Sequence, residues 1–172
     1  MVGELFSACT VLLRHCPTLS VGGGNLTHIS RRNSFLGAIR TKTTLSTSVR
    51  ETAICRVAVL NKAWFEWEHH APLLRACPEI KEEHIEVVLN APPHEASTTV
   101  LDERHSAVLA YSDAMTLDVN VKDDVFERLK KSFSDREVVE ITSTIAAYNC
   151  VSRFLVALDV GERNKQEGPL TR

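Results

Sequence analysis

The sequence predicts an all-α fold, a single domain built from about seven or eight helices. Apolar residues recur at helical spacing along most of the chain, and strand-like alternation of useful length is absent. Only seven Gly and six Pro occur in 172 residues, which favours long elements over many tight turns. A composition of 44% hydrophobic and 24% charged residues is typical of a globular domain with its own core.

The N-terminal part of the chain has the least regular pattern. Residues 5–13 are a short apolar segment that predicts a helix. Residues 20–32 include three consecutive glycines, and because each Gly costs a helix about 1 kcal/mol, we expect a loop there. Residues 34–40 then predict a short helix with Phe35 and Ile39 on one side.

Stronger helical patterns, the first with a broad apolar face, occupy the rest of the chain: residues 49–61, 64–76, 79–89, 101–117, 121–133 and 135–158. Residues 90–100 contain two consecutive prolines and predict a loop. Ser134 and Glu137 have the spacing of a capping box, which would begin the longest helix. Gly161 is expected to end that helix, and residues 162–172 are expected to form a disordered polar tail.

These patterns divide the chain into an N-terminal helix with a Gly-rich loop, a helical domain and a polar tail, at residues 1–32, 33–160 and 161–172. The net charge of −2 favours neither nucleic acid nor an acidic membrane surface as a partner. No stretch approaches the roughly 18 apolar residues that a membrane helix needs.

The charge distribution leaves two cellular locations open. Residues 1–50 hold six of the 20 basic residues but only one of the 22 acidic ones. An acid-poor start rich in Arg, Ser and Thr is typical of a mitochondrial transit peptide. Because residues 34–40 look like a helix of the fold, we favour a cytoplasmic protein. The five cysteines, none in a CxxC pair, agree with thiols buried in a reducing compartment.

The densest polar and aromatic cluster is WFEWEHH, at residues 64–70. On a helix, Glu66 and His70 lie four positions apart and share a face, and such a pair can transfer protons to and from a substrate. The alternative is a structural ion pair or a solvated face, which spacing alone favours. The neighbouring Trp67 indicates a pocket wall. A metal site is not expected, because the cluster lacks the HExxH spacing.

The pattern RE-x3-CRVAVLN-x3-FEWEHH over residues 50–70 resembles the core motif of the carboxymuconolactone decarboxylase family, which includes the alkylhydroperoxidase D branch. The similarity continues through residues 101–115 and 133–160. The resemblance implies an all-helical, AhpD-like domain that assembles into trimers or hexamers.

The resemblance also assigns residues to roles. In the peroxidase branch a Glu precedes a CxxC pair, and a His follows four residues after the second Cys. These positions fall here on Glu51 and His70, while Ala63 and Glu66 occupy the two cysteine positions. A thiol peroxidase needs both thiols, so peroxidase activity is not expected. The set that remains, Glu51, Glu66 and His70, is one of acid–base groups.

The preferred hypothesis is therefore a decarboxylase that acts on a small organic acid or lactone without a cofactor. His70, as imidazolium, would protonate the carbon after CO2 loss, Glu51 would orient it, and Glu66 would be a second acid–base group. An ionised Glu66 would repel a substrate carboxylate, which a raised pKa would relieve. The expected substrate-binding residues are Trp67, Asn149 and Arg153.

Two other functions remain open from the sequence. One is a different non-redox acid–base reaction on this scaffold, such as isomerisation or cyclisation of a natural-product intermediate. The other is a non-catalytic oligomeric binding protein with the same fold. Convergence of Glu51, Glu66 and His70 in the folded chain would favour an enzyme, and their dispersal would favour the binding protein.

Overall fold

The computed structural model describes residues 26–95 and 99–169, with side chains from Ser34 onward. These residues are all-helical and contain no strand, which confirms the predicted fold class. The helix expected over residues 5–13 lies outside the described residues. In chain order the elements are α2 (Leu26–Thr41), α3 (Thr47–Leu60), α4 (Trp64–Arg75), α5 (Glu82–Asn90), α6 (Glu103–Asp113), the π-helical η1 (Ala114–Asp118), α7 (Asp123–Ser132), α8 (Asp135–Ala157) and the 3-10 helix η2 (Val160–Glu162).

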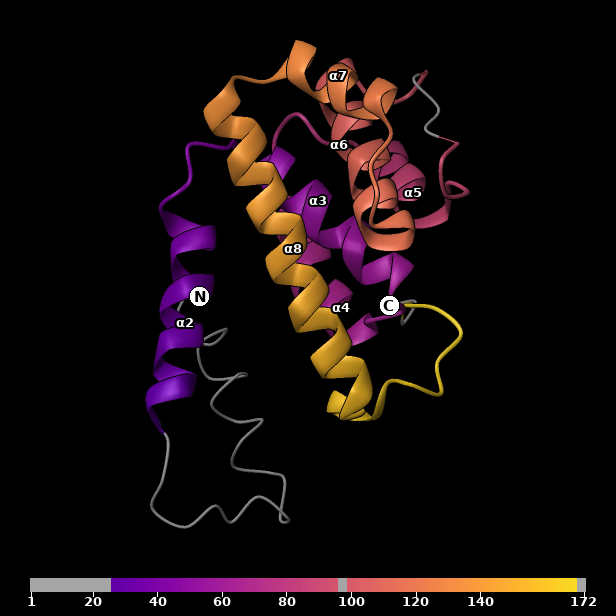
Figure 1. Cartoon of the computed structure of the whole chain (residues 1–172). Coiled ribbons are helices and arrows are strands. Elements are labelled where there is room, and N and C mark those ends of the chain that lie inside the picture. The colour runs from indigo at the N-terminus through magenta and orange to yellow at the C-terminus, as the bar shows by residue number, and fades with distance from the viewer. Residues whose placement is uncertain (1–25, 96–98, 170–172) are drawn as a thin grey trace.

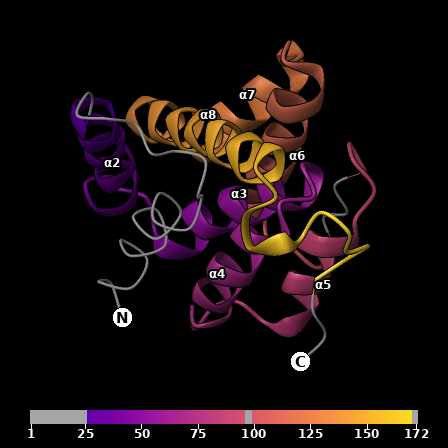
Figure 2. The ribbon, with the colours of Figure 1, turned by 90° about the horizontal axis from the view of Figure 1, so that it is seen from below.

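Helix α3 lies at the centre of the domain, between α8 and α4 (Figure 2). From Ser48 to Ala58 all its residues except Arg50 are buried. Ser46 caps the helix, because its hydroxyl accepts a hydrogen bond from the Val49 N–H at 3.3 Å. Two apolar clusters meet on α3, one formed with α2, α6 and α8 and the other formed with α4 and α5. Any polar side chain on α3 that points between these helices is therefore taken out of water.

Helix α2 begins at Leu26, so the loop expected over residues 20–32 is wrong for its second half. Residues 26–32 contain neither Gly nor Pro, and nothing in them interrupts a helix. The three glycines lie outside the described residues. The helix packs beside α8 at one edge of the domain (Figure 1), where Leu36 and Ile39 enter the core. Its C-terminal turn thereby places Arg40 near the buried centre.

Helix α8 begins where the sequence predicts and ends within one residue of the predicted end at residue 158. The Ser134 N–H donates to Glu137 Oε2 at 2.9 Å and the Glu137 N–H donates to Ser134 Oγ at 3.4 Å, which confirms the capping box. The expected stop at Gly161 is wrong, because the helix ends at Ala157 and Asp159 already has a left-handed φ of 47°. Gly161 has another role: with φ at 71°, an added Cβ would lie 2.8 Å from Phe65 Cδ2.

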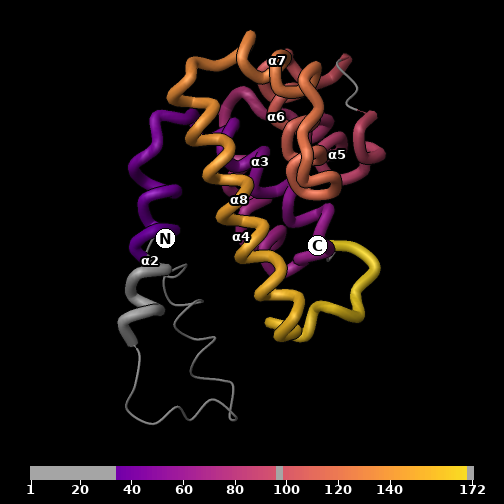
Figure 3. Tube along the Cα trace, in the orientation of Figure 1, coloured from indigo at the N-terminus to yellow at the C-terminus, as the bar shows by residue number. Residues whose placement is uncertain are grey.

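The segment after α8 folds back onto α4 (Figure 3). The Trp64 indole N–H donates to the Gln166 carbonyl at 3.1 Å, and Arg163 Nη2 donates to Glu68 Oε2 at 2.9 Å. The expected disorder of the tail is therefore wrong for the described residues up to 169. The physical reason is that two polar groups on α4 need partners, which a polar sequence supplies.

The remaining helices gather on the side of α8 away from α2 (Figures 1 and 3). The single helix expected over residues 101–117 is divided into α6 and the π-helical turn η1, and α5 begins at Glu82 rather than at residue 79. Among the described residues, no helix is both long and apolar enough to span a membrane.

Candidate acid–base site

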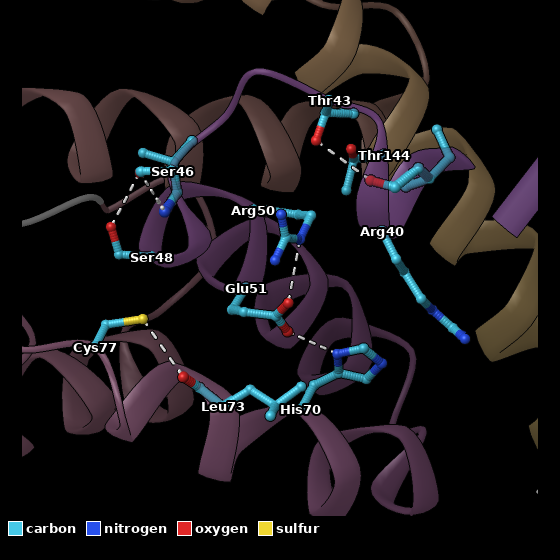
Figure 4. Close-up of polar contacts among 12 residues, drawn as sticks. Arg40, Thr43, Ser46, Ser48, Arg50, Glu51, His70, Leu73, Cys77 and Thr144 are labelled. Carbon is cyan, nitrogen blue, oxygen red and sulfur yellow. Dashed lines mark hydrogen bonds and ion pairs between the residues drawn. The ribbon is translucent and has the colours of Figure 1, made fainter. Parts of the chain in front are cut away.

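A hydrogen-bonded pair of side chains, Glu51 and His70, joins the two central helices. The turn after α3, where Lys62 has a φ of 54°, reverses the chain so that α4 packs alongside α3. His70 Nδ1 lies 2.7 Å from Glu51 Oε2, and both residues are buried (Figure 4). Arg50 Nε donates to the other oxygen, Glu51 Oε1, at 3.3 Å. The carboxylate thus fixes the position of the imidazole.

The same contact sets the tautomer and the charge of His70. Because Glu51 accepts at Nδ1, the neutral imidazole carries its proton on Nδ1 and a lone pair on Nε2. Burial lowers the pKa of His70 below its usual 6.5, and the hydrogen bond to Glu51 offsets only part of this effect. The neutral form is therefore favoured at pH 7, in place of the imidazolium that the sequence suggested.

Glu66 is a buried carboxyl group in the first turn of α4, only 3% exposed. Neither of its oxygens has a hydrogen-bond partner among the described residues. Burial raises the pKa of Glu66 well above its ordinary value, and the positive charge of Arg40 only partly opposes this. Burial thus favours the neutral carboxylic acid form of Glu66, which has an O–H to donate, one helical turn before His70.

Tyr148 and Arg40 complete the surroundings of His70, and neither was predicted from the sequence. The edge of the Tyr148 ring meets the His70 ring at a centroid distance of 5.0 Å. Arg40 Nε donates to the Tyr148 hydroxyl at 2.8 Å, across 108 residues of sequence. Burial raises the pKa of Tyr148, which keeps its hydroxyl protonated. Helices α2 and α8 therefore contribute to this region, although no local motif marks either residue.

The three predicted acid–base residues lie in one region of the fold. Glu51 and Glu66 both act electrostatically on Tyr148 and on Cys55, and His70 is in direct contact with Glu51 and Tyr148. Neighbouring His69 points elsewhere, with its Nδ1 2.7 Å from the Phe65 carbonyl oxygen. It is therefore a natural control for His70.

The three expected substrate-binding residues, Trp67, Asn149 and Arg153, have partners other than Glu51, Glu66 and His70. Trp67 is 3% exposed and packs within the apolar cluster of α4 and α5. Asn149 is buried and donates to Thr116 Oγ1 at 3.0 Å, while Arg153 donates to both oxygens of Asn149. Among the described interactions, none connects Asn149 or Arg153 to the acid–base residues.

The cysteine positions of the peroxidase motif hold other groups here. Ala63 is the residue just before α4, and Glu66 lies in its first turn, at the end where a helix stabilises a thiolate. Cys55 is fully buried, and burial, reinforced by Glu51 and Glu66, raises the pKa of its thiol well above 9.0. A thiol in this state is a weak nucleophile.

The raised pKa of Glu66 predicts how stability depends on pH. Below about pH 4.3 the group is protonated in both the folded and the unfolded state. As the pH rises, the unfolded chain releases this proton before the folded chain does. The free energy of unfolding therefore falls between the unfolded-state pKa and the folded-state pKa of Glu66. The Glu66→Gln variant lacks this loss. We therefore expect the difference in melting temperature, variant minus wild type, to increase from pH 4 to pH 8. Each kcal/mol of unfolding free energy corresponds to about 2–4 °C.

Thermal melting across this pH range checks the prediction, with the exposed Glu95→Gln as the matched control. The effect of His70 has the opposite sign, because its lowered pKa costs stability as the pH falls below 6.5. Both proteins retain His70, so this contribution cancels in the difference. A difference that stays constant from pH 4 to pH 8 would contradict a neutral, buried Glu66.

Comparison with known proteins shows a similarity of fold to two solved structures. No protein-family model and no curated protein matches the sequence. A solved structure from Agrobacterium tumefaciens, described as a protein of unknown function and a candidate antioxidant defence protein AhpD, superposes with a TM-score of 0.69 at 23% identity, over 86% of this chain and 94% of that one.

A second solved structure, an uncharacterised peroxidase-related protein from Silicibacter sp. TM1040, superposes with a TM-score of 0.67 at 19% identity. The match covers 83% of this chain and 75% of that one. The likeness at these identities is one of fold, and the chain has the all-helical AhpD-like fold.

Proposed function

We propose that the protein is a cofactor-independent acid–base enzyme that decarboxylates a small organic acid or lactone. The observation that carries this proposal is Glu66, a neutral carboxylic acid with no partner among the described residues, one turn before an imidazole that Glu51 holds in place. A buried polar group without a partner destabilises the fold, at about 1–3 kcal/mol. A proton donor aimed at a bound substrate explains why such a group is present.

The chemistry follows from the protonation states. When the bond to the carboxylate breaks, CO2 leaves and the electron pair moves onto an adjacent carbonyl, forming an enolate. The Glu66 carboxylic acid protonates the enolate carbon and becomes a carboxylate. His70, oriented by Glu51, passes a proton from water back to Glu66, so each turnover consumes one solvent proton. This assigns the donor role to Glu66 rather than to His70.

The neutral state of Glu66 also removes an electrostatic conflict. An ionised Glu66 would repel the carboxylate of the substrate, whereas the protonated acid does not. The same acid and the Nε2 lone pair of His70 would also suit proton transfer between two carbons without CO2 loss. Isomerisation is therefore the second candidate, and product analysis separates the two.

The test is a screen of keto acids and lactone acids with purified protein. Release of CO2 above the rate of a Glu66→Gln preparation is the expected result, and NMR of the products would show whether carbon–carbon cleavage or isomerisation occurred. The same preparation should not reduce a hydroperoxide with a dithiol reductant, since the peroxidase cysteine positions hold Ala63 and Glu66. Saturable binding without any turnover would favour the binding protein instead.

We further propose that the chain assembles into a homotrimer or homohexamer. One face of α8 presents exposed small and apolar residues at spacings of seven, four and seven: Val139, Ala146, Cys150 and Ala157. They lie within about 40° of one another around the helix, which makes a stripe suited to helix packing. We infer that α8 of another copy of the chain packs against this stripe.

Light scattering at micromolar concentration should return three or six subunits for the wild-type chain. Ala146→Glu places a charge in the middle of the stripe, so we expect it to release monomers with unchanged helical content. The exposed Lys131→Glu on α7 is the matched control and should leave the mass unaltered. A stable wild-type monomer would disprove the assembly.

A further inference from the structure

Arg40 is a cation placed beside the candidate site by a different helix. It lies in the last turn of α2, half-buried, and its Nε donates to the Tyr148 hydroxyl at 2.8 Å. Its guanidinium carbon lies 5.8 Å from the centre of the Tyr148 ring. In Figure 4 the Arg40 side chain and Glu51 lie on different sides of the His70 imidazole. Tyr148, fixed between Arg40 and His70, therefore determines where the guanidinium points.

Among the described residues, Arg40 forms no ion pair. Arg40 Nε donates its hydrogen bond to the Tyr148 hydroxyl. Neither Nη atom of Arg40 forms an ion pair or a hydrogen bond with a residue that the structure describes. Its charge acts on Glu66 and on His70, which places it near both. A planar guanidinium with two free N–H edges matches the two oxygens of a carboxylate.

Three other arginines of the surrounding helices are already engaged. Arg50 is paired with Glu51 Oε1 at 3.3 Å. Arg153 donates to Asn149. Arg56 forms a buried pair with Asp113. Glu66 adds no negative charge while it is protonated, and Glu51, the carboxylate hydrogen-bonded to His70, is engaged by His70 and Arg50.

We propose that Arg40 binds an anionic oxygen of the ligand, a carboxylate group, and that Tyr148 is the positioning residue that orients Arg40 for this contact. The proposal rests on the proposed function for the identity of the reacting centre, since Glu66 and His70 would then lie beside the bound anion. Arg40 thus takes the substrate-binding role that the sequence suggested for Arg153. The ligand class is then a carboxylate. A neutral ester or amide of the same shape should bind poorly.

The test uses crotonate, a small unsaturated carboxylate, and its uncharged amide crotonamide as the probe pair. Ligand-observed NMR with the full chain should show crotonate binding at least tenfold more tightly than crotonamide. Arg40→Ala should abolish this preference, Arg40→Lys should retain part of it, and Arg153→Ala should behave as wild type. Tyr148→Phe should weaken crotonate binding less than Arg40→Ala, because the ring remains and only the hydroxyl is lost.

Melting curves of Arg40→Ala and Arg40→Lys check that each variant is folded, and Arg40→Lys keeps the test valid if the alanine variant unfolds. Equal binding of crotonate by wild type and a folded Arg40 variant would overturn the proposal, as would no preference for crotonate in wild type. Loss of the preference together with no CO2 release from any acid would leave Arg40 as the anion site and refute the decarboxylase. If Arg40→Ala turned over an acid with the KM of wild type, the decarboxylase would stand and Arg40 would not be the anion site.

Discussion

Glu66→Gln should lower turnover of the substrate by about 10²-fold or more and should melt no lower than wild type at pH 7. The amide keeps the size of the side chain but has no acidic proton to give to the enolate carbon. It also ends the cost of holding a buried carboxyl group protonated, which supports the folded state. A large loss of rate with equal or greater stability is the signature of a group that serves chemistry rather than structure.

Matched variants on the same helices make this test specific. His70→Gln should also cost about 10²-fold or more, since it removes the Nε2 base, and Glu51→Gln should lower the rate because the imidazole loses its orienting carboxylate. His69→Gln should change the rate little, because that ring is hydrogen-bonded to the Phe65 carbonyl. If the Glu51 and His70 variants melt lower but turn over normally per folded molecule, the pair is structural.

Asp113→Ala should be the most destabilising single substitution considered, at about 3–5 kcal/mol. Arg56 is 1% exposed, and its Nε and Nη2 donate to the two Asp113 oxygens at 2.5 and 3.0 Å. The other guanidinium contacts are the carbonyl oxygens of Val88 and Ala91, each at 3.0 Å. Without Asp113 the cation is left buried and unpaired in the centre of the domain.

Denaturant and thermal unfolding measure this loss, and two controls interpret it. Arg75 and Glu82 form an exposed pair, 44% and 64% accessible, so Arg75→Ala should cost less than about 1 kcal/mol. Replacing both buried partners, as Arg56→Met with Asp113→Leu, should recover most of the stability, because no charge is then stranded. An Asp113→Ala protein as stable as the Arg75→Ala protein would show that water reaches the buried pair.

The Arg56–Asp113 pair also explains how the fold supports the site. Through Arg56 it ties α3 to the end of α6 and to the chain after α5, since the His94 N–H also donates to Asp113 Oδ2 at 2.9 Å. The helix that carries Glu51 is thereby fixed from its far side.

The sequence by itself predicted the helical class, most helix boundaries and the three residues, Glu51, Glu66 and His70, that the fold brings into one region. Helical spacing and capping residues act within a few positions of one another, which is why the Ser134–Glu137 box and the α4 segment are correct from local pattern alone. Gly161 as the residue that ends α8 and the disordered tail were wrong predictions. Gly161 leaves room for Phe65, and the tail binds Trp64 and Glu68, and these contacts are distant in sequence.

Only the tertiary structure decided the charges and the partners. Glu66 and His70 share a face by spacing, yet His70 bonds to Glu51 on the neighbouring helix, and burial raises the pKa of Glu66 and lowers that of His70, so it favours the neutral form of each. The contacts of Arg40 with Tyr148 and of Arg56 with Asp113 bridge helices that no local pattern relates. The physical reason is that a protonation state depends on the water removed and the charges brought near by the whole fold, and spacing along one helix carries neither quantity.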